Sequence, residues 1–169
     1  VWIQDGSPSL VDCDFLNNRS EGSYGGGGLF SDVSSPALEG CLFEGNQAID
    51  SLGDGGGAHF FGGGTTPLTH CTFTDNEAGD SGGGVFADPY FSETLVLECT
   101  DVSFLNNTSS DRGGGLCLDS ADGTLIDCTL QGNSAAFGGG LWSFGDPVQI
   151  GDTTICVSFT IGTSMQLNN

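Results

Sequence analysis

The chain has 169 residues and a formal net charge of −20 at neutral pH, with 22 acidic residues, two arginines and no lysine. Such a charge repels nucleic acids and anionic lipid surfaces, so we expect neither as a partner. No run of residues approaches the roughly 18 apolar residues of a membrane span, and we expect no membrane insertion. Thirty glycines argue against a helix-rich fold, because each glycine costs about 1 kcal/mol relative to alanine in a helix.

Short apolar strands follow glycine runs at regular intervals along the chain. These units are Gly26–Phe30, Gly55–Phe60, Gly82–Phe86, Gly113–Leu118 and Gly138–Trp142. Because side chains alternate between the two faces of a strand, the residue after each glycine run is expected to point inward and the next one outward. The expected outward column, which the first strand of the chain continues, contains Trp2, Phe30, His59, Phe86, Cys117 and Trp142.

A second unit, L-x-x-C-x-F-x-x-N, follows each of these strands. Its copies are Leu10–Asn18, Leu38–Asn46 and Leu68–Asn76, with looser copies at Cys99–Asn107 and Leu125–Asn133. A degraded sixth copy begins at Thr153 and is expected to place Cys156 at the cysteine position. Positions 13, 41, 71, 102, 128 and 156 lie 26–31 residues apart, and such a period indicates a repeat architecture.

The repeat is typical of a β-solenoid. A leucine-rich repeat would also match the nine-residue motif, but it requires helical spacing after the asparagine, and no 3.6-residue periodicity is present. We therefore predict an all-β fold, a right-handed parallel β-helix of about six rungs of 26–31 residues, with three short strands per rung. Residues 1–169 are expected to form a single β-helix domain. Since Val1 is not an initiator methionine, we expect a processed chain or a segment of a longer solenoid.

The F-x-x-N and G-G-[AGILV] motifs resemble the repeats of chlamydial polymorphic outer-membrane proteins and, more broadly, the pectin-lyase-like β-helix superfamily. This resemblance implies the fold, and it implies an asparagine ladder at one corner. Polysaccharide lyases of that superfamily act on polyanions with calcium and a basic residue. A chain with two arginines is a poor host for a polyanion, so we expect no enzymatic activity and keep a polysaccharide hydrolase or lyase as the alternative.

The asparagine column is expected to be structural, because stacked side-chain amides can bond along the helix axis and satisfy backbone groups at a corner. It contains Asn18, Asn46, Asn76, Asn107 and Asn133. These positions should be buried. The exposed Asn106, which also lies in an N-x-T pattern, is therefore the expected glycan acceptor.

The cysteines are expected to be mainly small buried hydrophobic groups. Stacked rungs also place Cys13 beside Cys41, and Cys128 beside Cys156, within the distance that a disulfide spans. No zinc motif and no calcium-binding loop motif is present, so we expect no metal cofactor beyond loosely bound Ca²⁺. Its candidate ligands are the loop residues Asp50, Asp54, Asp80 and Asp111.

Two functions remain open. The first is a non-enzymatic structural or adhesive β-helix, extracellular or at the cell surface, whose subunits associate end to end or are attached to a longer chain. The second is a carbohydrate-binding or carbohydrate-cleaving β-helix that uses the outward aromatic column beside a flat glycine strip. If long loops fold over this column, the column is not available to bind carbohydrate.

Overall fold

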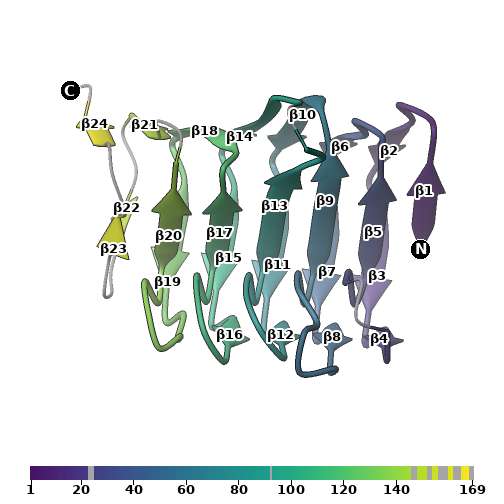
Figure 1. Cartoon of the computed structure of the whole chain (residues 1–169), viewed down its shortest axis with the longest axis horizontal. Coiled ribbons are helices and arrows are strands. Elements are labelled where there is room, and N and C mark those ends of the chain that lie inside the picture. The colour runs from purple at the N-terminus through teal and green to yellow at the C-terminus, as the bar shows by residue number, and fades with distance from the viewer. Residues whose placement is uncertain are drawn as a thin grey trace.

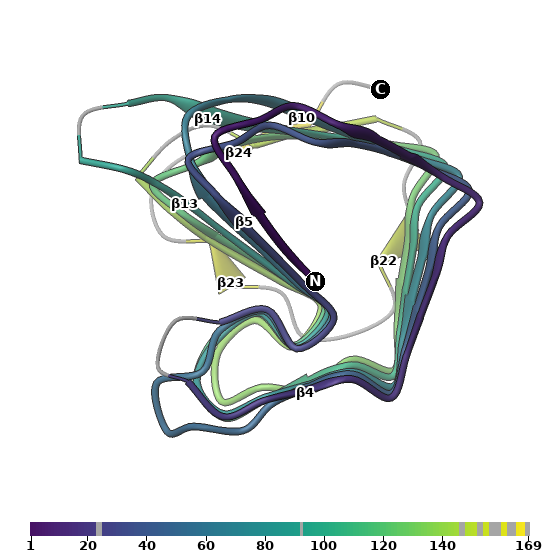
Figure 2. The ribbon, with the colours of Figure 1, turned by 90° about the vertical axis from the view of Figure 1, so that its right-hand side faces the viewer.

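The computed structural model describes residues 1–22, 25–91, 93–145, 148–151, 154–155, 160–161 and 165–167. These residues form an all-β parallel solenoid, as the period of the sequence predicts (Figure 1). Each rung adds one strand to each of several parallel sheets. Viewed along the axis, successive rungs superimpose closely, so equivalent residues of the repeats lie on top of one another (Figure 2).

Four sheets, which we call A to D, run along the solenoid. Sheet A contains β1(Trp2–Gln4), β5(Leu29–Asp32), β9(Ala58–Gly62), β13(Val85–Pro89), β17(Leu116–Asp119), β20(Leu141–Phe144) and β23(Thr160–Ile161). Sheet B contains β2(Ser9–Val11), β6(Ala37–Glu39), β10(Gly64–Thr69), β14(Leu95–Thr100), β18(Asp122–Ile126), β21(Val148–Ile150) and β24(Met165–Leu167). Sheet C contains β3(Asp14–Leu16), β7(Leu42–Glu44), β11(Thr72–Thr74), β15(Ser103–Leu105), β19(Thr129–Gln131) and β22(Thr154–Ile155). Sheet D contains the two-residue strands β4(Arg19–Ser20), β8(Gln47–Ala48), β12(Glu77–Ala78) and β16(Thr108–Ser109).

The nine-residue motif spans two sheets, so a complete rung has four strands where three were predicted. A residue with positive φ bends the chain between sheets B and C, and it is Asp12, Gly40, His70, Asp101 or Asp127. A second such residue, immediately before the ladder asparagine, is Asn17, Gly45, Asp75, Asn106 or Gly132. Most of these residues are Gly, Asn or Asp, which tolerate the left-handed conformation best. The pattern of apolar residues alone does not show these bends.

The core lies inside the solenoid and is built from columns of like residues. The phenylalanine rings of sheet C stack nearly in parallel, with centroids 4.3 Å apart for Phe15 and Phe43, and 4.6 Å for Phe43 and Phe73. Phe104 continues this stack at 5.3 Å from Phe73. Leucines of sheets A and B fill the remaining space, although Leu10 in the first rung is only partly buried. Among the described residues, no helix is long and apolar enough to cross a membrane.

The predicted alignment of the last repeat is wrong. Strand β19 pairs with β22 so that Thr129 lies beside Thr154 and Leu130 beside Ile155. In this register Ile155 follows Leu130 in the phenylalanine column, whereas the predicted alignment placed a later residue there. Cys156 itself lies outside the described residues.

Candidate functional site

The asparagine ladder lies at the corner between sheets C and D. The Asn76 side chain shows the repeated pattern: its Nδ2 donates to the Phe43 carbonyl at 2.9 Å and to Asn107 Oδ1 at 2.9 Å. Its Oδ1 accepts from the backbone N–H and the Nδ2 of Asn46, at 2.9 and 3.0 Å. Both donors and both acceptor positions of this buried amide are therefore used inside the fold. The Asn76 amide therefore has no polar atom left to bind a ligand.

The first ladder residue differs from the prediction. Asn18 is exposed, whereas Asn46, Asn76, Asn107 and Asn133 are buried. Asn18 bonds only to the rung on one side, through Nδ2 to Asn46 Oδ1 at 2.9 Å. Asn106, at the adjoining corner, is exposed and has a φ of 54°. Its glycosylation stays a prediction.

The cysteine column contains thiols directed at backbone carbonyl groups. Cys13 and Cys41 are both free, so the disulfide that their stacking allows is not formed. Each sulfur points to a carbonyl two residues earlier, with Cys13 Sγ 3.3 Å from Val11 O and Cys41 Sγ 3.5 Å from Glu39 O. Burial raises the pKa of Cys41, and it raises the pKa of Cys71 to about 11. Such thiols remain protonated and unreactive at neutral pH.

Cys128 follows the same pattern at the other end of the column. Its Sγ lies 3.3 Å from Ile126 O and 3.6 Å from Cys99 O. The predicted pairing with Cys156 falls outside the described residues. Thiols of this kind occur in reducing and oxidising compartments alike, so they do not indicate where the protein resides.

The outer face of sheet A is covered in its middle rungs. His59 and Phe86 are only 5% and 8% exposed, and Cys117 is fully buried. The connections between sheets D and A curl back beside this face, and their glycine runs press against it (Figure 2). A Cβ atom at Gly82 would lie 2.6 Å from Cβ of Phe86, and one at Gly113 would lie 2.7 Å from Cβ of Cys117. Of the two alternatives, the covered one therefore holds in these rungs, because the glycines are buried where a side chain would clash with the neighbouring backbone and side chains.

A polar cluster stabilises this covered region. His59 Nε2 lies 2.7 Å from Asp88 Oδ1, while its Nδ1 is buried without a hydrogen-bond partner in the part of the chain that the structure describes. Asp54, in the loop before β9, accepts a hydrogen bond from the Ser81 N–H at 3.0 Å. Burial raises the pKa of Asp54 to about 6, and the nearby His59 partly opposes this rise. The cluster joins residues of the loops to residues of sheet A, so its role is to hold the loops against the sheet.

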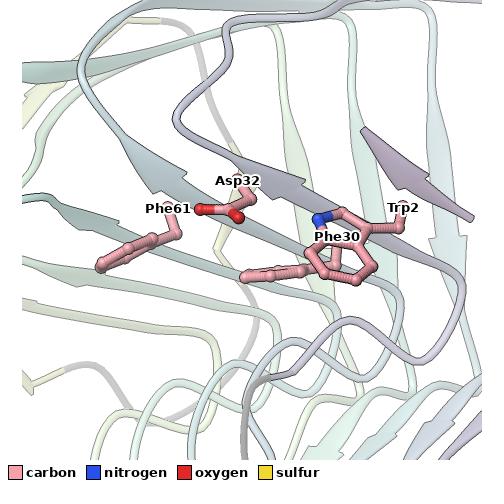
Figure 3. A pocket seen from close by; sticks show the side chains of 4 residues that line it. All are labelled: Trp2, Phe30, Asp32 and Phe61. Carbon is pink, nitrogen blue, oxygen red and sulfur yellow. The ribbon is translucent and has the colours of Figure 1, made fainter. Parts of the chain in front are cut away.

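Two pockets open at the ends of the covered region. The first, which we call the aromatic pocket, has a volume of about 390 Å³ and is lined by Trp2, Phe30, Asp32 and Phe61. Trp2 is 67% exposed, and its ring centroid lies 6.3 Å from that of Phe30. The side chains come from three successive strands, β1, β5 and β9, and the Asp32 carboxylate lies among the rings (Figure 3).

The aromatic surface continues from the pocket onto the loop after β13. The ring of Phe61 contacts Tyr90 edge to face at 5.3 Å, and Tyr90 contacts Phe91 at 4.4 Å. Phe91 is 86% exposed. Asp32 and Phe61 lie two residues after the predicted outward column on their strands, so strand alternation could have identified them. Tyr90 and Phe91 lie in a loop, and no periodic signal pointed to them.

The second pocket, which we call the arginine pocket, is lined by Arg112, Asp119, Trp142 and Phe144 and has a volume of about 290 Å³. The Arg112 guanidinium carbon lies 4.7 Å from the centroid of the Trp142 ring, a cation–π contact. Two carboxylates flank it, with Nε 3.0 Å from Asp111 Oδ2 and Nη1 3.6 Å from Asp119 Oδ2. Burial raises the pKa of Asp119, and Arg112 partly offsets this rise.

The carboxylates of this face are mostly paired. Asp88 is bonded to His59, and Asp119 is paired with Arg112. General acid–base hydrolysis of a glycoside requires two carboxyl groups placed on either side of a substrate. In the described ranges, no three His, Cys, Asp or Glu side chains come together as metal ligands, and loose Ca²⁺ binding stays a prediction.

Comparison with known proteins agrees with this architecture. A family model described as the right handed beta helix region matches residues 1–155 of the chain. No match was found among curated proteins or among solved structures. The match concerns the β-helix as a whole and does not bear on the resemblance to the chlamydial repeats.

Proposed function

Because this chain belongs to the right-handed β-helix family, we propose that it is a non-enzymatic, adhesive β-helix, extracellular or at the cell surface, that binds carbohydrate. The binding surface is the outer face of sheet A at the aromatic pocket. The ladder and the phenylalanine stack provide a rigid frame, and the outer residues of sheet A differ from rung to rung. Adhesion requires such a frame and a recognition surface, without a catalytic group.

The observation that carries the proposal is the aromatic pocket itself. Saccharide-sized ligands bind in concave sites that are mostly apolar and contain a few polar groups. Three rings surround a single carboxylate here, and Trp2 presents most of its surface to solvent. Exposed rings gathered in one place are a typical mark of a binding surface. The ring faces can stack on the C–H face of a sugar, and Asp32 can accept hydrogen bonds from its hydroxyl groups.

A glycan-binding screen tests this proposal. We expect the chain to bind at least one class of oligosaccharide, and Trp2→Ala to weaken that binding at least about tenfold, which corresponds to about 1.4 kcal/mol. Phe61→Ala should act in the same direction. Leu16→Ala is the matched control, since it removes a half-exposed apolar side chain from the outer face of sheet C. Absence of binding across a broad panel would refute the proposal.

End-to-end association of subunits stays a separate prediction. Parallel strands at the end of a solenoid can pair with those of another copy, which would propagate a filament. Sedimentation of the natural, full-length protein at its native ionic strength tests this directly. A dispersed monomer would contradict the filament without affecting carbohydrate binding.

A further inference from the structure

We propose that the aromatic pocket recognises an ammonium group, so that the preferred carbohydrate carries free amino groups, as in a glucosamine oligosaccharide. This inference rests on the proposed function, because it names the class of saccharide that the same pocket binds. It adds a charge requirement that neutral and acidic sugars do not meet.

The first argument is the composition of the pocket. The faces of Trp and Phe rings attract a cation within about 6 Å of the ring centroid, and Trp does so most strongly. Figure 3 shows Asp32 between Phe61 on one side and the rings of Trp2 and Phe30 on the other. A cation placed there would meet ring faces and a negative charge together. None of the four lining residues is itself cationic.

The second argument is that Asp32 lacks the partner that its counterparts have. Asp32, Asp88 and Asp119 occupy the same outward column of sheet A, as the register of β5, β9, β13 and β17 shows. The Asp88 carboxylate is bonded to His59, and that of Asp119 is paired with Arg112. The Asp32 carboxylate has no ion pair or hydrogen bond with any other described residue. A half-exposed carboxylate among aromatic rings is open to a cation from a ligand.

The third argument comes from the other end of the same face, where the chain supplies the cation itself. Trp142 belongs to the same column as Trp2, and Arg112 lies over its ring at 4.7 Å. Asp119, from the neighbouring rung, completes that site. In the rung of Asp32, Gly25 occupies the position that Arg112 occupies in the rung of Asp119. The chain therefore supplies no cation to Asp32 from this position, and a ligand ammonium would supply the charge that Arg112 supplies to Asp119.

The charge of the whole chain acts in the same direction. A net charge of −20 concentrates cations near the surface and repels anions such as uronic acid polymers. Arg112 is already paired with Asp111 and Asp119 and contacts Trp142. Arg19 lines an adjoining pocket with Trp2 and Phe30 and is paired with Glu21 at 3.2 Å. An extended amino sugar polymer can also follow the rings of Phe61, Tyr90 and Phe91, which a small amine would leave unused.

Calorimetric titration with two oligosaccharides of equal length tests the inference, one of glucosamine and one of N-acetylglucosamine. The measurement uses the intact protein at low salt, at a pH where the amines are protonated. We expect the glucosamine form to bind at least about tenfold more tightly, and this preference to shrink as salt increases. Asp32→Asn should remove most of the preference, because the neutral amide can still hydrogen-bond to sugar hydroxyl groups but no longer attracts an ammonium group. Trp2→Ala should weaken both ligands.

Asp14→Asn is the matched control, because it removes the same unit of charge from an exposed carboxylate on sheet C. Its preference for the glucosamine form should equal that of the unmodified chain. Circular dichroism and thermal unfolding of each variant establish that it is folded. Equal binding of the two oligosaccharides, or a preference that survives Asp32→Asn, would overturn the inference while carbohydrate binding stands. Binding of neither oligosaccharide overturns the inference, and the broader glycan panel then decides the proposed function separately.

Discussion

The asparagine ladder and the outer face of sheet A lie on the same stack of rungs, but only the ladder repeats one residue at every rung. In the ladder, each amide bonds to a copy of itself one rung away, as Asn46, Asn76 and Asn107 show. On sheet A, the outward column changes from tryptophan to phenylalanine, histidine and cysteine, and its exposure changes as well. A residue that bonds to the equivalent residue of the next rung cannot change without breaking that bond. A residue that faces a loop or a ligand can change without affecting the other rungs.

This difference separates the two regions by what a mutation should affect. Substitutions in the inward columns and the ladder should lower the free energy of unfolding. Substitutions in the two pockets should leave stability almost unchanged and alter binding. The covered middle of sheet A should behave like the first group, although it lies on the outer face.

The largest expected effect is in the phenylalanine stack. Phe73→Ala removes a fully buried ring that stacks on Phe43 and Phe104. We expect a loss of about 3–5 kcal/mol in the free energy of unfolding, measured by urea denaturation. Phe91→Ala, at an exposed ring, should change stability by less than about 0.5 kcal/mol. Similar losses at both positions would contradict the division between frame and surface.

The ladder should come next. Asn76→Ala leaves the Asn46 N–H buried without a partner, and it removes the side-chain hydrogen bonds that Asn76 makes with the Phe43 carbonyl, Asn107 Oδ1 and Asn46 Nδ2. At about 1–3 kcal/mol for each unsatisfied group, we expect a loss of about 2–4 kcal/mol. Asn18→Ala is the control, because this exposed amide bonds on one side only and its loss should cost about 1 kcal/mol or less. If the two variants lose the same free energy of unfolding, a buried ladder asparagine stabilises the fold no more than an exposed one.

A pair of substitutions tests whether the outer face of sheet A is divided into a covered part that stabilises the fold and an exposed part that binds a ligand. Phe86→Ala should lower stability by about 2–3 kcal/mol, because the ring lies beneath a glycine run and its loss leaves a cavity. Phe61→Ala, in the half-exposed aromatic pocket, should cost less than about 1 kcal/mol but weaken saccharide binding. Thermal unfolding and glycan titration of the same two proteins measure both quantities. Phe86→Ala with full stability would show that the loops do not hold this ring.

The last prediction concerns pH and the covered polar cluster. Burial raises the pKa of Asp54 to about 6 from an ordinary value of 3.8, so the folded state binds a proton more readily than the unfolded state. Between pH 4 and 6, this group therefore lowers stability as pH rises, and its contribution levels off above that range. Asp80 and Asp119 have pKa values shifted in the same direction by burial. Asp54→Asn should reduce the fall in stability between pH 4 and 6. An unchanged slope would place this carboxylate in solvent.

The sequence repeat predicts spatial neighbours correctly where each residue contacts the equivalent residue of the next repeat. The spacing of Asn46 and Asn76, and of Phe43 and Phe73, follows the period, and the structure places both pairs in contact. Prediction failed where the period ends or the chain bends. Cys156 was aligned by counting, whereas the backbone register brings Ile155 beside Leu130. The bends at Gly40 and Gly45 divide one apparent side into two sheets.

The sequence by itself determined the solenoid, its inward columns and its asparagine corner, because in a stacked repeat a fixed spacing along the chain becomes direct contact in space. Only the tertiary structure decided which outward residues remain available. The loops before sheet A differ in length between repeats, and their path buries His59 and Phe86. The pairing of Asp119 with Arg112, and the absence of such a partner at Asp32 among the described residues, depends on the same loops. Contacts made by loops of unequal length carry no period, so the sequence pattern could not reveal them.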